Sequence, residues 1–139
     1  LLSRRPIRMQ DRINQACHAD SMARLKITLI LESGARIGPG KAALLESVRA
    51  TGSIAAAARA MGMDYKRAWL LVDSLNRAFA TPTVERMAGG PRGGGATLTA
   101  FGEELLARYR RLQAAAAELA ADDLAALERH ALPDAGPKV

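Results

Sequence analysis

The stretch that decides the fold reads Thr51-Gly-Ser-Ile-Ala-Ala-Ala-Ala-Arg-Ala-Met-Gly-Met-Asp-Tyr-Lys-Arg-Ala-Trp69. It predicts a short helix, a tight turn and a second helix. The Ser53 hydroxyl can accept a free backbone N–H at the start of the first helix, expected over Ile54–Met61. Gly62 supplies the left-handed conformation that ends a helix, and Asp64 can cap the next one. A helix-turn-helix of this kind inserts its second helix into the major groove of DNA, so DNA binding is the leading hypothesis.

The segments before this stretch predict a strand, a loop and a helix. Residues Leu25–Glu32 are rich in β-branched side chains and partly alternate, which is typical of a strand. The glycine- and proline-containing segment Arg36–Gly40 predicts a loop. A helix is expected over Lys41–Ala50, with a buried stripe at helical spacing made by Ala43, Leu44, Leu45 and Val48.

The second helix of the motif is expected over Tyr65–Ala80, where Pro82 prevents its continuation. At about 100° per residue, its apolar positions gather on one face. This predicted buried face consists of Ala68, Leu71, Val72, Leu75 and Phe79. The opposite face carries Lys66, Leu70, Asp73 and Arg77, with Tyr65, Trp69 and Asn76 on one flank and Arg67 on the other.

A glycine-rich segment follows and predicts a β-hairpin wing. Short strands are expected at Val84–Met87 and Ala96–Thr99, around the basic segment 88–95. Arg86 and Arg92 would contact phosphate or the minor groove, and a loose hairpin tip is the alternative. The same glycines do not form a nucleotide-binding loop, because no Gly-Lys-Ser/Thr follows them.

The chain ends in a long helix. It is expected to begin at Thr99 or Ala100 and to reach Leu132. The organisation is therefore a basic tail over residues 1–23, a winged helix over 24–99, the last helix over 100–132 and a tail over 133–139. The basic N-terminal tail is either an arm that touches phosphates or additional sequence without a role in binding. The fold class is mainly α with a small β-hairpin.

Composition limits the classes of function. The 139 residues carry a net charge of +6 with a pI of about 10.2, which favours polyanionic partners. The single cysteine, Cys17, excludes an intramolecular disulfide and a multi-cysteine zinc site. No apolar run approaches the ~20 residues that a membrane span requires, and no signal peptide is found. We therefore expect no metal, no membrane association and a cytoplasmic location.

The outer surface of the motif has the side chains that read or hold DNA. Arginine pairs with guanine, asparagine pairs with adenine, and apolar atoms contact the thymine methyl group. Tyrosine and serine hydroxyls can donate to phosphates and so fix register. Asp73 repels phosphate, so it must point at a cytosine amino group, pair with Arg77 or lie away from the DNA. The predicted DNA-binding residues are Ser53, Tyr65, Lys66, Arg67, Trp69, Asn76, Arg77, Arg86 and Arg92.

The segment from about Leu25 to Leu112 resembles the N-terminal DNA-binding domain of the ModE-type molybdate-responsive regulators, which are related to the winged helices of LysR-type regulators. Five motifs of the helix-turn-helix carry the resemblance: Gly52-Ser-Ile54, Ala57-Ala58, Met61-Gly62-Met63, Tyr65-Lys-Arg-Ala-Trp69 and Asn76. The wing and its exit add Val84-Glu85-Arg86, Gly89-Gly90, Gly93-Gly94-Gly95, Leu98-Thr99 and Phe101-Gly102.

The resemblance implies a winged helix and a homodimer on a pseudo-palindromic site, with the terminal helix in the dimer. The seven-residue spacing of Leu105, Leu112 and Leu119 fits such a seam, which Phe101 would extend. A solvated helix packed on its own domain is the alternative. Two departures matter: the chain ends too soon for the family's molybdate-binding module, and Asp64 and Leu70 stand where a Ser-like cap and a polar residue are expected.

The alternatives to DNA binding are a protein-interaction module, an enzyme and an oxyanion-binding protein. A winged helix can serve as a protein-interaction module, for which exposed Trp69 and Leu70 and the alanine-rich last helix would suffice. An enzyme is not supported, because no Ser/His/acid set, metal-ligand cluster or phosphate loop is found. No cofactor is predicted, and no pocket is found for molybdate or another oxyanion, although a helix N-terminus can bind an anion.

Overall fold

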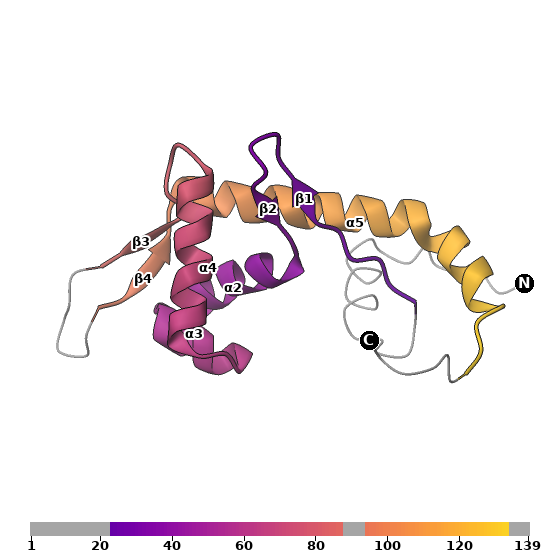
Figure 1. Ribbon diagram of the computed structural model, residues 1–139, viewed down its shortest axis with the longest axis horizontal. Helices are drawn as coiled ribbons and strands as arrows, with labels where there is room; N and C mark the ends of the chain where they lie inside the picture. The colour runs from indigo at the N-terminus through magenta and orange to yellow at the C-terminus, as the bar shows by residue number, and fades with distance from the viewer. Residues whose placement is uncertain (1–22, 88–93, 134–139) are drawn as a thin grey trace, which may run out of the picture. The chain divides into compact units, whose positions relative to one another are not determined.

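The computed structural model describes residues 23–87 and 94–133. Lys26–Leu112 forms one compact unit, and residues from Gln113 onward belong to a second. The elements are, in chain order, β1 (Leu29–Ile30), β2 (Arg36–Ile37), α2 (Pro39–Thr51), α3 (Ile54–Met61), α4 (Tyr65–Ala78), β3 (Val84–Arg86), β4 (Ala96–Leu98) and α5 (Ala100–Glu128). Figure 1 shows the β3–β4 hairpin extending from the group of helices, so the fold is a winged helix.

The first strands correct the sequence prediction. Only Leu29–Ile30 of the expected strand is extended, and it pairs antiparallel with Arg36–Ile37, which was expected to be loop. Gly34 has a φ of 90° at the turn between them, and the Leu31 amide donates to the Ala35 carbonyl at 2.9 Å. Ser33 and Gly34 thus lie in a hairpin turn between the two strands. A strand of two residues is too short to reveal itself by alternation.

Helix α2 begins two residues earlier than predicted. Pro39 stands at its first turn, where a missing N–H costs nothing and the fixed φ suits the helix. Gly52 ends the helix in the left-handed conformation, with φ 78°. The buried residues are Ala42, Leu44, Leu45 and Val48, so Ala42 takes the place predicted for Ala43, which is half-buried.

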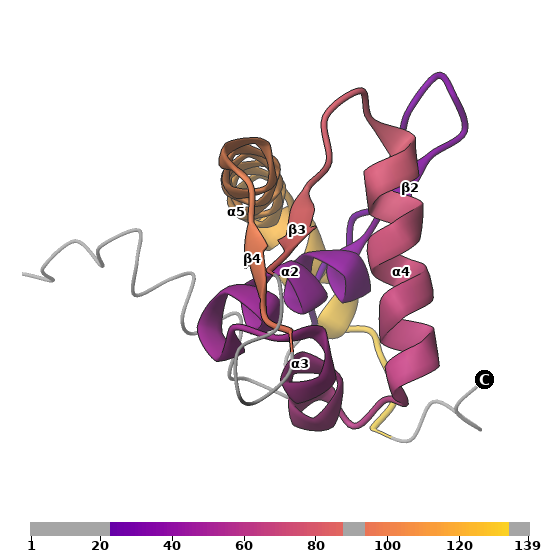
Figure 2. The same ribbon diagram turned by 90° about the vertical axis from the view of Figure 1, so that its left-hand side faces the viewer.

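Helices α3 and α4 form the predicted helix-turn-helix. The Ser53 hydroxyl accepts a hydrogen bond from the Ala56 amide at 2.9 Å. Gly62, with φ 67°, ends α3, and the Asp64 carboxylate accepts from the Arg67 amide at 2.8 Å to begin α4. The turn joins the lower ends of the two helices in Figure 2. All three capping predictions are confirmed.

Helix α4 ends at Ala78, two residues before the predicted end, because Phe79 is already extended. Its buried residues are Ala68, Val72 and Leu75, as predicted, while Leu71 is half-buried. Phe79 is also half-buried and lies edge-on to Phe101, with the ring centroids 5.0 Å apart. The end of α4 therefore packs on the start of α5.

The wing is attached to the helix-turn-helix by its backbone. The Ala96 amide donates to the Gly52 carbonyl at 2.8 Å, and a Cβ on Gly95 would lie 3.0 Å from that same oxygen. β3 pairs antiparallel with β4, each strand one residue shorter than predicted. Residues 88–93 of the predicted wing lie outside the described residues.

Helix α5 begins where its backbone crosses the segment before β3. The Thr99 amide donates to the Thr83 carbonyl at 3.0 Å, and the Thr99 hydroxyl accepts from the Gly102 amide at 2.9 Å. A Cβ on Gly102 would come within 2.1 Å of the Thr83 carbonyl oxygen. Only glycine therefore permits this crossing. The helix extends to Glu128 rather than to the predicted Leu132.

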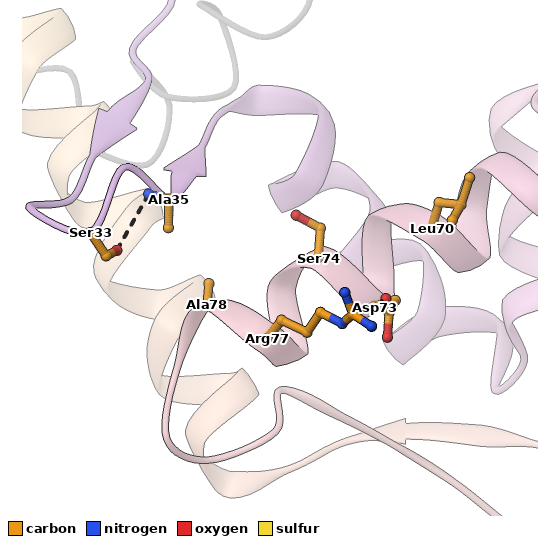
Figure 3. Close-up of a pocket in the computed structure, with 7 residues that line it drawn as sticks. All are labelled: Ser33, Ala35, Leu70, Asp73, Ser74, Arg77 and Ala78. Atoms are coloured by element: carbon orange, nitrogen blue, oxygen red, sulfur yellow. Dashed lines mark hydrogen bonds and ion pairs between the residues drawn. The ribbon is translucent and has the colours of Figure 1, made fainter.

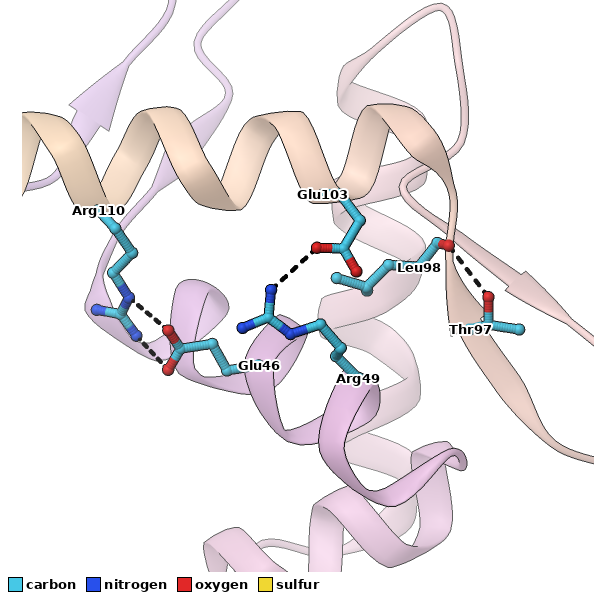
Figure 4. A network of polar contacts seen from close by, with 6 residues as sticks. All are labelled: Glu46, Arg49, Thr97, Leu98, Glu103 and Arg110. Atoms are coloured by element: carbon cyan, nitrogen blue, oxygen red, sulfur yellow. Dashed lines mark hydrogen bonds and ion pairs between the residues drawn. The ribbon is translucent and has the colours of Figure 1, made fainter.

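Ion pairs join α2 to the first turns of α5 (Figure 4). The Arg110 guanidinium donates to both carboxylate oxygens of Glu46, at 2.8 and 2.7 Å. Arg49 donates to Glu103 at 2.9 Å. All four side chains are partly exposed, so each pair stabilises the fold modestly. These pairs hold α5 in its orientation against α2. They also provide the Arg49 and Arg110 cations with carboxylate partners.

The core beneath these pairs is aliphatic, with one aromatic anchor. Tyr109 is 1% exposed, and its hydroxyl donates to the Ile27 carbonyl at 2.9 Å. Burial raises the pKa of the Tyr109 phenol, an effect that the neighbouring Arg110 cation partly opposes.

No helix within residues 23–87 and 94–133 combines the length and apolar character that crossing a membrane requires.

Candidate nucleic-acid interface

One face of α4 is exposed along its first two turns. Tyr65 is 50% exposed, Trp69 38% and Leu70 51%, and Lys66 and Arg67 are also exposed. The cause is the helical pattern, because Ala68, Val72 and Leu75 turn the opposite face into the core. Large apolar side chains beside cations form a surface that suits groove edges and phosphates.

The cations of the winged helix fall into two groups. Arg49, Arg108 and Arg110 each form an ion pair with a glutamate of α2 or α5, and Arg77 pairs with an aspartate of α4. Lys66, Arg67 and Arg86 form no ion pair with any residue that the structure describes. Within the described residues, no carboxylate pairs with these cations, which leaves an attractive potential for a polyanion at the start of α4 and along β3.

Arg86 joins β3 to α4. Its guanidinium donates to the Tyr65 hydroxyl at 3.0 Å. The same guanidinium lies over the Trp69 ring, 5.8 Å from the ring centroid. Tyr65 and Trp69 are four residues apart on one helix, so they occupy the same flank. The sequence placed them on that flank but did not identify Arg86 as the residue that contacts both.

Further along α4, the outer face borders an open hollow next to the β1–β2 turn (Figure 3). The helix contributes Leu70, Asp73, Ser74, Arg77 and Ala78, while the turn contributes Ser33 and Ala35. Arg77 pairs with Asp73 at 3.2 Å, and its side chain is 82% exposed. The repulsive carboxylate is thus neutralised by one of the residues predicted to bind DNA.

Asn76 has a different role from the one predicted. Its side-chain oxygen accepts from the amide and hydroxyl of Thr83, both at 2.8 Å, and from the Val84 amide at 3.2 Å. Its amide nitrogen donates to the Val84 carbonyl at 3.2 Å. The amide is therefore occupied in fastening α4 to β3. We do not retain Asn76 as a residue that pairs with adenine.

Ser53 is half-buried at the start of α3, where its oxygen accepts the capping hydrogen bond. The hydroxyl proton makes no hydrogen bond to any residue in the described ranges, so it is available to a phosphate. Arg92, the other predicted contact of the wing, lies outside the described residues. The predicted contacts Tyr65, Trp69 and Arg86 are the three that direct contacts bring together.

The residues predicted for the dimer seam divide along α5. Leu105 is 9% exposed and belongs to the core of its own domain, and Phe101 is half-buried against Phe79. Leu112 is 47% exposed and Leu119 86% exposed. The idea that all four line one seam therefore needs correction, since Leu105 is buried in its own domain and Phe101 already packs on Phe79.

Comparisons with known proteins identify relatives. No family model matches the chain. The molybdenum-pterin-binding protein MopB of Rhodobacter capsulatus is 47% identical over 92 residues, which are 66% of this chain and 34% of that protein. The molybdenum transport protein ModE of Azotobacter vinelandii is 36% identical over 88 residues, 63% of this chain and 33% of that protein.

A third relative matches a longer stretch. The DNA-binding transcriptional dual regulator ModE of Escherichia coli strain K12 is 33% identical over 121 residues, 79% of this chain and 46% of that protein. The chain thus spans about a third to nearly half of the length of these relatives. Over the part that they match, it is a homologue of the ModE-type transcriptional regulators.

Proposed function

We propose that the chain is part of a sequence-specific transcriptional regulator that binds double-stranded DNA as a homodimer. The observation that carries this proposal is the exposed surface at the start of α4, where Tyr65, Lys66, Arg67, Trp69 and Leu70 stand together. In a helix-turn-helix, the first residues of the second helix are the ones aimed at base edges. The printed name of the Escherichia coli relative, a DNA-binding transcriptional regulator, supports the same conclusion.

Each exposed residue type suits one kind of contact. Lys66 and Arg67 would neutralise phosphates or pair with guanine in the major groove. Leu70 would contact a thymine methyl group. Arg77 pairs with Asp73, and this carboxylate offsets its positive charge. Arg77 would therefore attract a DNA phosphate less strongly than an arginine without a carboxylate partner. The Ser53 hydroxyl would donate a hydrogen bond to a phosphate of the DNA backbone.

The wing would form the second contact. Arg86 on β3 and the glycine-rich segment 88–95, with Arg92, would lie against phosphate or the minor groove. Support comes from the backbone bond that ties Ala96 to Gly52, since it fixes the hairpin relative to the helix-turn-helix. A wing held in this way adds contacts with little loss of conformational entropy on binding.

Dimerisation would use the exposed leucines of α5. Leu112 and Leu119 are seven residues apart and exposed, which is the spacing of a coiled-coil seam. Two copies related by a two-fold axis would present two α4 helices to the half-sites of a pseudo-palindrome.

A protein-interaction module is the alternative function, and it is favoured by the exposure of Trp69 and Leu70. The two functions differ in their dependence on salt, because phosphate contacts weaken sharply as salt rises. Weak, salt-insensitive DNA affinity together with a tight protein partner would select the alternative.

The test is a binding screen against genomic fragments by mobility shift. The proposal predicts a preferred fragment with a two-fold-symmetric core, and an affinity about tenfold or more weaker for Arg67→Ala. Arg108→Ala is the matched control, because it removes an exposed arginine that pairs with Glu104 on α5. Normal binding by Arg67→Ala, or no preference among fragments, would contradict the proposal.

A further inference from the structure

We infer that Tyr65 and Arg86 form one composite site for a single DNA phosphate at the junction of α4 and β3, with Trp69 as its floor. The inference deepens the proposed DNA binding and rests on it. It replaces two separate contacts with one site whose two donors act together.

The direction of the hydrogen bond between the two residues is the first step. A guanidinium has only donors, so at 3.0 Å the Arg86 nitrogen must donate and the Tyr65 oxygen must accept. The phenol proton is then left for another acceptor. Because the phenol oxygen accepts from a cation, its own O–H becomes a stronger donor. A phosphate oxygen is the acceptor that gains most from this polarisation.

The stacking on Trp69 is the second step. The Arg86 carbon lies 5.8 Å from the centroid of the Trp69 ring, within the range of a cation–π contact. This contact is electrostatic and uses none of the guanidinium N–H groups as hydrogen-bond donors to a protein acceptor, so those not bonded to Tyr65 stay available. With the bond to Tyr65, it fixes the orientation of an otherwise flexible side chain before DNA arrives.

The surroundings of the pair are the third step. Tyr65 is 50% exposed, and Arg86 is exposed and forms no ion pair with any described residue. Glu85 directly precedes Arg86 in β3, and because successive side chains of a strand alternate, its carboxylate points to the opposite face of the hairpin. A phosphodiester offers two non-bridging oxygens, one for the Tyr65 hydroxyl and one for an Arg86 N–H.

The test is a double-mutant cycle with Tyr65→Phe and Arg86→Gln, measured by fluorescence anisotropy. The probe is a short fluorescein-labelled duplex of arbitrary sequence at low salt. Such a duplex suffices because phosphate contacts dominate non-specific binding. Circular dichroism and thermal melting establish that each variant is folded, and Arg108→Gln is the control for loss of an exposed arginine.

A shared site predicts three results. Each single substitution weakens binding severalfold to about tenfold. Arg86→Gln lowers the slope of log K against log salt by about one, whereas neutral Tyr65→Phe leaves the slope unchanged. The loss of affinity in the double variant is much smaller than the product of the two single losses. The reason is that the first substitution already leaves the remaining donor out of position to contact the phosphate.

Independent, multiplicative losses would overturn the shared site while leaving DNA binding intact. Unchanged affinity in both single variants, together with a lowered melting temperature, would also overturn the shared site. The contacts among Tyr65, Trp69 and Arg86 would then stabilise the fold without binding a phosphate. Absence of binding by the unsubstituted chain would contradict the proposed function itself. The single tryptophan adds a readout without DNA, since Arg86→Gln should alter Trp69 fluorescence if the stacked contact exists in solution.

Discussion

The side-chain oxygen of Asn76 accepts two hydrogen bonds from Thr83, from its amide and from its hydroxyl, each 2.8 Å long. Thr83 is fully buried, so these bonds satisfy donors that water cannot reach. The pair sets the angle at which the chain leaves α4 and enters the wing. The position of β3, and of Arg86 upon it, therefore depends on an amide in the last turns of α4.

Asn76→Ala should lower the free energy of unfolding by about 2 kcal/mol, because buried donors of Thr83 lose their acceptor. Asn76→Asp keeps the acceptor oxygen for Thr83, but it replaces the donation to the Val84 carbonyl by repulsion between two oxygens, so it should also destabilise the fold. Urea denaturation measures both values. Full stability of Asn76→Ala with loss of sequence preference on DNA would instead restore Asn76 as a reader of bases.

Gly102→Ala should destabilise the fold by about 1–3 kcal/mol, because a Cβ would meet the Thr83 carbonyl oxygen at 2.1 Å and force the backbone apart. Gly40→Ala is the matched control within α2, where a Cβ meets nothing within 4 Å. That control should be neutral or slightly stabilising. Equal thermal melts for the two variants would show that the crossing of α5 over Thr83 is not tight in solution.

Stability should fall at alkaline pH through Tyr109. Burial raises the pKa of this phenol above its ordinary value of 10.0, so the folded state holds the proton more tightly than the unfolded state. The stabilisation is complete below pH 10 and is lost as pH rises through the raised pKa of the folded state.

Tyr109→Phe should be less stable at neutral pH by about 1 kcal/mol, since the Ile27 carbonyl loses its donor. The difference between the two proteins should shrink above pH 10. A constant difference across that range would contradict this reasoning.

Leu119→Glu should weaken self-association by about tenfold or more, because the charge would enter an apolar seam. Sedimentation equilibrium measures the monomer–dimer constant. Ala121→Glu is the control, since Ala121 is also exposed and lies about 200° around the helix from Leu119. Identical constants for both variants and the unsubstituted chain would remove Leu119 from any dimer interface.

The elements with local signals were predictable from sequence. Ser53, Gly62 and Asp64 act within four residues of themselves, so their capping roles follow from residue type and position. The buried face of α4 follows from periodicity. By contrast, the β1–β2 pair depends on two-residue strands, which carry no periodic pattern.

The contacts that assemble the candidate interface were not predictable in the same way. Arg86 is 21 residues from Tyr65, and their meeting depends on how the wing leaves α4. Asn76 was placed on the correct flank, yet its partners Thr83 and Val84 lie in the following segment. Leu105 has the spacing of a seam residue and is nevertheless buried in its own core. Spacing alone does not distinguish an internal contact from an external one.

The salt dependence of duplex binding tests most directly whether α4 faces DNA. The logarithm of the binding constant should fall linearly with the logarithm of salt concentration. The slope should become shallower by about one in Lys66→Ala and again in Arg67→Ala, and should be unchanged in Arg108→Ala. Binding that ignores salt, or a slope that changes equally in all three variants, would contradict DNA binding through the start of α4.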